Sequence, residues 1–187
     1  MDILDIFQSP TPVTITGRTS TITNAFVTSI IPSMPPTREQ LRKCLSILKL
    51  DESDLRCAYC GDKSTEWDHL RPLVRDKKPT GYISDIFNLV PSCGKCNQSK
   101  GNKYWEDWIT SKAKKSPKSR GKTDIDERSE RLKKYEKWSN VTPINFEVYV
   151  DKELWKEYWA TREKICEMMK KAQQLADRVD NNIKNRV

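Results

Sequence analysis

The sequence predicts an α+β protein in which a small central module, closed by a metal site, is flanked by helices. Three observations carry this prediction. Two Cys-x-x-Cys pairs frame the middle of the chain, helical patterns lie on both sides of them, and the first 36 residues are rich in Thr, Ser, Pro and β-branched residues. Paired cysteines at this spacing are typical of zinc sites, and the N-terminal composition is typical of extended segments and turns.

Residues 1–54 are predicted to form an N-terminal arm, extended over residues 1–36 and packed on the rest of the protein, followed by one helix. Thr37 and Gln40 have the spacing of a capping box, which predicts a helix over about 37–49. Four apolar residues then share one helical face: Leu41, Cys44, Leu45 and Leu48.

Residues 111–187 are predicted to contain a basic loop and C-terminal helices that contact DNA, mediate dimerisation, or both. Six Lys or Arg residues occur over 112–122, together with Pro and Gly, so this segment is either a solvated flexible linker or a strip that touches phosphates. Acidic residues early and basic residues late favour a helix over 123–138.

A long helix is predicted from about Asp151 onward. Apolar residues recur in it at alternating spacings of four and three, forming a heptad-like seam: Ile165, Met169, Ala172, Ala176, Val179 and Ile183. This seam belongs either to an intramolecular core or to a homodimer interface.

The net charge of +8 and the pI near 9.2 favour an anionic partner, of which nucleic acid is the commonest. No apolar run is long enough for a membrane helix, so no membrane association is expected. The N-terminus carries two acids and no basic region typical of a secretory signal, so we expect a cytoplasmic location.

The two cysteine pairs predict a structural zinc site. Thirty-two residues separate the pair Cys57 and Cys60 from the pair Cys93 and Cys96. Four thiolates close a tetrahedral coordination sphere and leave no open position for a substrate. The alternatives are four unrelated buried cysteines, or a redox dithiol, which needs only one pair. Disulfides are not expected in a reducing compartment.

The loop between the two pairs contains a second group of polar residues. His69 is the single histidine of the chain and directly follows Asp68. Asn88 precedes the second cysteine pair, and Asn97 follows it directly. A helix is predicted from Asn97 to about residue 109, anchored by tryptophans. Asn97 is therefore also a candidate N-cap of that helix.

These residues, in this order, resemble the HNH endonucleases of the ββα-metal fold. The elements that carry the resemblance are CAYC, DHLRPL, GYI, FNLVPSC and CNQSKGNK, within residues 57–108. The N-terminal sequence ITNAFVTSIIP and the helix after it are also similar to small stand-alone bacterial HNH proteins of restriction type. The resemblance implies a nuclease module over 55–110, with hairpin strands near 65–70 and 85–90.

The resemblance also implies a role for each polar residue. His69 would be the general base that deprotonates the attacking water. Asp68 and Asn97 would bind the catalytic divalent metal, normally Mg²⁺, with Mn²⁺ able to replace it. Asn88 would hold the loop between the strands and so orient His69. The chemistry agrees, since imidazole titrates near neutral pH and oxygen ligands suit a hard cation.

Nearby basic residues are weaker candidates for phosphate contacts. Arg71, Lys100 and Lys103 either bind DNA or are ordinary solvated positions, and the same holds for Arg75, Lys77 and Lys78.

The function predicted from all these features is a metal-dependent endonuclease acting on double-stranded DNA, with site specificity of the type II restriction kind. The alternatives are a non-catalytic zinc-stabilised module that binds nucleic acid or a protein, and a nicking or homing-type HNH nuclease. The intact set of Asp68, His69, Asn88 and Asn97 favours a nuclease over the binding module.

Overall fold

The computed structural model describes residues 6–7 and 9–186, and an antiparallel pair of strands lies in the middle part of the chain. Strand β1 (Glu66–His69) pairs with β4 (Leu89–Ser92), so that Asp68 lies opposite Val90 and His69 opposite Leu89. The second strand thus begins where the expected range of 85–90 nearly ends. Between them, β2 (Val74–Arg75) and β3 (Lys78–Pro79) form a tight hairpin.

Helices account for most of the secondary structure, which confirms the predicted α+β class. They are α1 (Thr19–Ser29), α2 (Arg38–Leu48), α3 (Gly94–Lys100), α4 (Trp105–Ile109), α5 (Ile125–Ser139) and α6 (Lys152–Lys184). Short 3-10 turns lie at Thr16–Arg18, Lys118–Arg120 and Phe146–Tyr149. None of the helices in the described part of the chain has the length and apolar content of a bilayer span.

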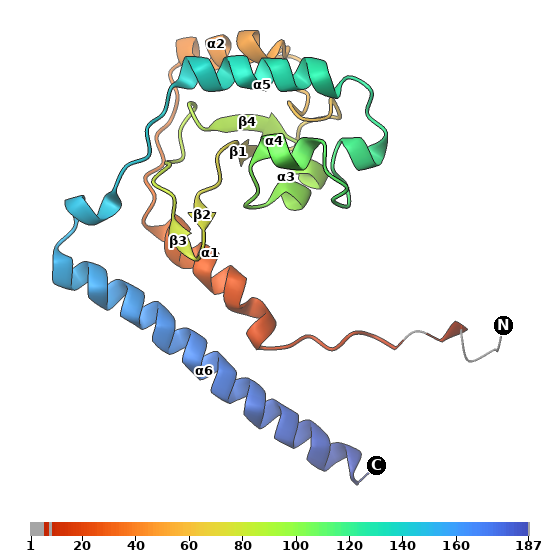
Figure 1. Cartoon of the computed structure of the whole chain (residues 1–187), viewed down its shortest axis with the longest axis vertical. Helices are drawn as coiled ribbons and strands as arrows, with labels where there is room; N and C mark the ends of the chain where they lie inside the picture. The colour runs from red at the N-terminus through yellow and green to blue at the C-terminus, as the bar shows by residue number, and fades with distance from the viewer. Residues whose placement is uncertain (1–5, 8, 187) are drawn as a thin grey trace. The chain divides into compact units, whose positions relative to one another are not determined.

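The chain divides into two compact units, and the boundary between them falls within α1. One unit is Val27–Tyr149, and the other combines Met1–Phe26 with Val150–Val187. In the first unit, α2 and α5 run side by side next to the strand pair (Figure 1). Tyr135 of α5 donates its hydroxyl to the carbonyl oxygens of Ile86 and Leu89, at 2.7 and 3.1 Å, and so holds α5 against β4.

Helix α2 forms where its cap predicts. Thr37 Oγ1 accepts from the Gln40 amide, and the Gln40 side chain accepts from the Thr37 amide, which completes the capping box. Cys44, Leu45 and Leu48 are buried, and the first and last belong to the core cluster. The predicted helices over 123–138 and from Asp151 onward are confirmed as α5 and α6, with Asp151 capping α6.

The prediction of an extended N-terminal arm is wrong for residues 19–29, which form α1. Threonine and isoleucine disfavour helices only weakly, and tertiary contacts override that preference. Thr23 is buried and accepts a hydrogen bond from Arg162 of α6 at 2.6 Å. Phe26 packs on Tyr158 with ring centroids 5.0 Å apart. The helix therefore forms because α6 supplies a partner surface.

The single helix predicted from Asn97 to residue 109 is two helices, α3 and α4. Gly101 adopts a positive φ of 51° at the end of α3, which ends that helix. Trp105 and Trp108 of α4 are buried, as expected of anchors. Trp108 donates its indole N–H to Ser99 of α3, at 3.0 Å, and so fixes the two helices together.

The seam predicted on α6 is only partly covered in the described structure. Met169 and Ala172 are half-buried, whereas Val179 and Ile183 are 57% and 56% exposed. The buried face of α6 instead carries Arg162 and Cys166. The first half of the helix thus packs within its own unit, and the second half presents apolar side chains to solvent.

Candidate active site and metal centre

The four cysteines of the two Cys-x-x-Cys pairs converge on one point. Their Sγ atoms all lie within 4.8 Å of one another, and the Sγ atoms of Cys60 and Cys93 are 3.7 Å apart. A zinc ion bound at about 2.3 Å by four sulfurs requires sulfur–sulfur edges of about 3.8 Å. All four residues are buried. The cluster therefore fits a structural zinc ion.

The second cysteine pair begins the helix that faces the strand pair. Cys93 is the N-cap residue of α3, and Cys96 lies in its first turn. Asn97 is consequently inside the helix, and the suggestion that it caps the helix is wrong. The cysteine cluster thus includes the residue at which α3 begins, and three residues after Cys93 the second sulfur of the pair lies in the first turn.

Asp68 and Lys100 form a buried ion pair between β1 and α3. Lys100 is fully buried, and its Nζ lies 3.1 Å from Asp68 Oδ2 and donates to the His69 carbonyl at 2.7 Å. Tyr59 also donates its hydroxyl to Asp68 Oδ2, at 2.6 Å. Because both contacts fall on Oδ2, Oδ1 is the carboxylate oxygen left for a cation.

Burial shifts both pKa values of this pair toward the neutral forms. It raises the pKa of Asp68, and the charge of Lys100 and the Tyr59 hydroxyl act in the opposite direction. It lowers the pKa of Lys100, which the Asp68 carboxylate opposes. The attraction between the two charges therefore offsets part of the desolvation cost on each.

His69 lies at the end of β1, and its ring contacts the loop that follows the hairpin. Its Nε2 is 2.7 Å from Ser84 Oγ. Burial and the nearby Lys100 charge lower the pKa of His69 to about 4. The backbone of Ser84 is held by two hydrogen bonds to residues 32–34, at 2.9 and 3.0 Å. The imidazole is thus neutral at physiological pH and fixed by a hydroxyl that is itself anchored.

Asn97 is bound to Glu66 rather than to Asp68. Its Nδ2 donates to Glu66 Oε2 at 2.6 Å, which leaves Oδ1 as the amide's acceptor. Glu66 and Asp68 are two positions apart on β1 and share a face, and Asn97 and Lys100 are three apart on α3. The strand and helix therefore meet through two parallel polar pairs.

Asn88 is fully buried and closes the long loop between β1 and β4. Its Oδ1 accepts from the Arg71 amide at 2.9 Å, and its Nδ2 donates to the carbonyl oxygens of Arg71 and Ile83. The Leu70 amide also donates to the Asn88 carbonyl at 2.8 Å. This geometry suits the loop-holding role expected of Asn88, which remains a prediction.

The three weaker DNA-contact candidates lie in different surroundings. Lys100 has no exposed surface, so its placement is at odds with a phosphate contact. The Arg71 guanidinium is mostly buried and pairs with Glu136 and Ser139 of α5, at 3.5 and 3.2 Å. Lys103 is exposed and donates to the Ser99 carbonyl at 3.0 Å. Of the three, only Lys103 keeps the exposure that binding DNA requires.

Three residues of this site were not predicted from the sequence: Tyr59, Glu66 and Ser84. Glu66 could have been found, because an acid two positions before Asp68 lies on the same face of a strand. Tyr59, inside the first Cys-x-x-Cys, and Ser84 give no comparable signal, since only the tertiary fold brings them to Asp68 and His69.

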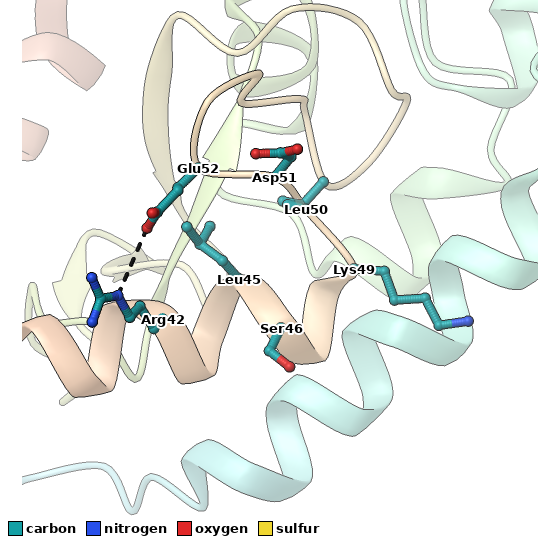
Figure 2. Close-up of a pocket in the computed structure, with 7 residues that line it drawn as sticks. All are labelled: Arg42, Leu45, Ser46, Lys49, Leu50, Asp51 and Glu52. Atoms are coloured by element: carbon teal, nitrogen blue, oxygen red, sulfur yellow. Dashed lines mark ion pairs between the residues drawn. The ribbon is translucent and has the colours of Figure 1, made fainter.

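A surface pocket elsewhere in the same unit contains none of these residues. It is lined by Arg42, Leu45 and Ser46 of α2 and by residues 49–52 after it (Figure 2). An ion pair of 3.9 Å between Arg42 and Glu52 crosses it. Its lining carries charges of both signs, and none of its residues belongs to the group around Asp68 and His69.

Comparison with known proteins supports the resemblance seen in the residues. The family model for HNH endonucleases matches residues 57–103. The chain is also similar to the CRISPR-associated endonuclease Cas9 of Corynebacterium diphtheriae, with 35% identity over 77 residues, which are 39% of this chain. That match spans only 6% of the length of the Cas9 chain. No solved structure matches.

The matched segment begins at the first cysteine of the cluster and ends just beyond α3. It therefore includes both cysteine pairs, the strands β1 and β4, and four polar residues of the site: Asp68, His69, Asn88 and Asn97. Residues 57–103 of this chain form a domain of the HNH endonuclease family.

Proposed function

We propose that this protein is a metal-dependent endonuclease that hydrolyses phosphodiester bonds in double-stranded DNA. One observation carries the proposal: within the HNH-family segment, Asp68 and His69 end a strand that faces α3, in a module whose ends meet at four clustered cysteines. A binding module would need the cysteines but not this arrangement of acid, imidazole and amide.

The structural zinc ion would be held by Cys57, Cys60, Cys93 and Cys96. Two short strands and one short helix bury too little surface to be stable alone, so a metal that joins their ends contributes directly to folding.

The catalytic metal would be held by Asp68 Oδ1 and Asn97 Oδ1, the oxygens not used in the contacts described above. Both are hard ligands of the kind that Mg²⁺ and Mn²⁺ prefer. When bound, such an ion neutralises phosphate charge and stabilises the departing oxygen. Lys100 and Tyr59 orient the Asp68 carboxylate through Oδ2, and Glu66 orients the Asn97 amide through Nδ2.

His69 is the proposed general base. Because its Nε2 is engaged with Ser84 Oγ, Nδ1 is the nitrogen available to accept a proton from water. The water oxygen then bonds to phosphorus, the bond to the 3′ oxygen breaks, and that oxygen takes up a proton from solvent. The products are a 5′-phosphate and a 3′-hydroxyl. With a pKa of about 4, the imidazole is deprotonated and ready at neutral pH.

We further propose sequence-specific, restriction-type cleavage in the cytoplasm by a homodimer. The chain outside residues 57–103 is long enough to add DNA contacts, and one HNH site cuts one strand, so two copies would cut both. The exposed apolar residues of α6, such as Val179 and Ile183, are candidates for the dimer contact. A nicking or homing-type nuclease is the alternative with the same chemistry.

Cleavage of supercoiled plasmid in Mg²⁺ tests the proposal, comparing wild type, His69→Ala, and wild type with EDTA. Lys43→Ala, a change of an exposed α2 residue outside the basic segment 112–122, is the matched control. We expect discrete fragments from wild type and Lys43→Ala, and a loss of about 10²- to 10⁴-fold in His69→Ala. Equal cleavage by His69→Ala and wild type would exclude His69 as the base. Absence of cleavage despite tight DNA binding would favour the non-catalytic module.

A further inference from the structure

The zinc cluster is contacted by a segment that lies outside the HNH-family match. This segment, residues 116–128, includes the end of the basic loop 112–122, which was expected to be either a solvated linker or a strip that touches phosphates. In the structure Ser116 is fully buried, and three cations from this segment reach the first cysteine knuckle, residues 57–62. The segment is therefore part of the metal centre's surroundings.

Arg120 is the cation that joins the two knuckles. Its NH1 donates to Cys96 Sγ at 3.5 Å, in the second pair, and its NH2 donates to the carboxylate of Asp62, directly after the first pair. The two ends of one planar guanidinium thus span the cluster. Its side chain is 17% exposed, so it covers the sulfurs from solvent.

The neighbouring cations bind the same knuckle without touching sulfur. Lys122 donates to the other oxygen of Asp62 at 2.7 Å. Arg128 donates to the Cys57 carbonyl at 3.3 Å and lies against Gly61, where an added Cβ would meet its NH2 at 2.3 Å. Lys122 thus contacts a side chain of the knuckle and Arg128 its backbone, whereas Arg120 also contacts the sulfur of Cys96.

We propose that Arg120 is a positioning residue for the zinc site, retaining the metal by donating an N–H···S hydrogen bond to the Cys96 thiolate. A zinc ion with four thiolates carries a net negative charge, which an adjacent guanidinium stabilises. The hydrogen bond also fixes the position of the Cys96 sulfur, because the same guanidinium is held by Asp62 of the other knuckle. The inference depends on the cysteine cluster and not on the proposed nuclease activity.

Zinc release from the full-length, zinc-loaded protein tests this role. The rate of transfer to 4-(2-pyridylazo)resorcinol would be measured for wild type, Arg120→Gln, Arg120→Lys and Lys122→Gln. Losing an outer-shell partner typically weakens metal affinity about 10- to 100-fold, and we expect Arg120→Gln to release zinc faster by about the same factor. Arg120→Lys keeps the positive charge but cannot contact Cys96 and Asp62 with two separate nitrogens, so we expect an intermediate rate of zinc release.

Lys122→Gln is the control that distinguishes the loss of the Arg120–Cys96 contact from the loss of a positive charge beside Asp62. It removes a cation from the same carboxylate but leaves Cys96 untouched, so we expect release within about twofold of wild type. Equal acceleration by Lys122→Gln and Arg120→Gln would overturn the proposal, as would wild-type release from Arg120→Gln.

Replacing zinc by Co²⁺ gives an absorption spectrum that depends on the sulfur ligands and not on the overall stability of the protein. We expect the sulfur-to-cobalt charge-transfer bands of the Co²⁺ protein to shift in Arg120→Gln and to stay unchanged in Lys122→Gln. Identical spectra in all variants would count against an N–H···S bond. If Arg120→Gln does not fold, Arg120→Lys takes its place: a shifted Co²⁺ spectrum with faster zinc release supports the proposal, and wild-type values for both overturn it.

Discussion

The two proposed metal sites of the HNH segment differ in how their ligands are held. The four cysteine sulfurs already converge with the spacing that a zinc ion requires. In the proposed catalytic site, Asp68 pairs with Lys100 and Asn97 with Glu66, so each proposed ligand is held by a neighbouring side chain. A structural ion belongs to the folded core, whereas a catalytic ion must come and go at a site that remains folded without it.

The largest effect should come from removing one cysteine knuckle. In Cys93→Ser/Cys96→Ser we expect zinc to be lost and residues 57–103 to unfold, because a structural zinc site contributes about 10 kcal/mol or more, comparable with the stability of a whole domain. Zinc content and the dispersion of amide NMR signals measure this. Cys44→Ala, also a buried cysteine but outside the cluster, should keep its zinc. Native dispersion in the double variant would show that the cluster is dispensable.

Breaking the ion pair between Asp68 and Lys100 should reduce stability less than removing a cysteine pair does. In Lys100→Met the Asp68 carboxylate stays buried without its cation, and we expect a loss of about 3–5 kcal/mol in urea denaturation. The variant Asp68→Asn/Lys100→Met should lose less than the sum of the single changes, because neither charge is then left alone. Lys103→Met, exposed and three residues away, should change stability by about 0.5 kcal/mol or less. Additive losses would show that Asp68 and Lys100 are not coupled.

The pH dependence of cleavage should reveal the buried imidazole. Protonation removes the base, so activity falls as pH drops through the pKa of His69, which burial lowers to about 4. We expect initial rates at fixed Mg²⁺ to stay level from pH 8 down to about pH 6, where an ordinary histidine with a pKa near 6.5 would already have lost most of its activity. An acid limb with a midpoint near 6.5 would contradict the buried environment.

The smallest effect should follow the loss of the exposed partner of Asn97. Glu66→Ala removes one hydrogen bond worth about 1 kcal/mol, and we expect the Mg²⁺ concentration for half-maximal cleavage to rise by roughly fivefold. Thermal stability should change little. Glu106→Ala, an exposed acid on α4, is the control. A loss as large as that in Asp68→Ala would instead mean that Glu66 itself is a metal ligand.

Features set by short-range chemistry could be predicted from the sequence. The cysteine spacing predicted the cluster, the Thr37–Gln40 pair predicted the start of α2, and Asp151 marked the start of α6. The residue order around Asp68 and His69 was enough to indicate the family, which the comparison with HNH endonucleases confirms.

Features set by long-range contacts could not be predicted. Helix α1 depends on Arg162 and Tyr158, more than a hundred residues away, and its own threonines gave the opposite indication. Lys100 seemed a surface cation because nothing in its neighbours indicates that α3 turns it toward Asp68. The positive charge of residues 112–122 could be read from the sequence, but the hydrogen bond from Arg120 to Cys96 could not.

The hydrogen bonds between residues 32–34 and Ser84 have a practical consequence for dissecting this protein. A fragment cut to the family boundaries, 57–103, would lose the clamp on the loop that touches His69. It would also lose Arg120 beside Cys96 and the Tyr135 hydroxyl that supports β4. The smallest excisable fragment therefore runs from before residue 32 to beyond Ser139, and shorter pieces should be inactive for reasons unrelated to the catalytic residues.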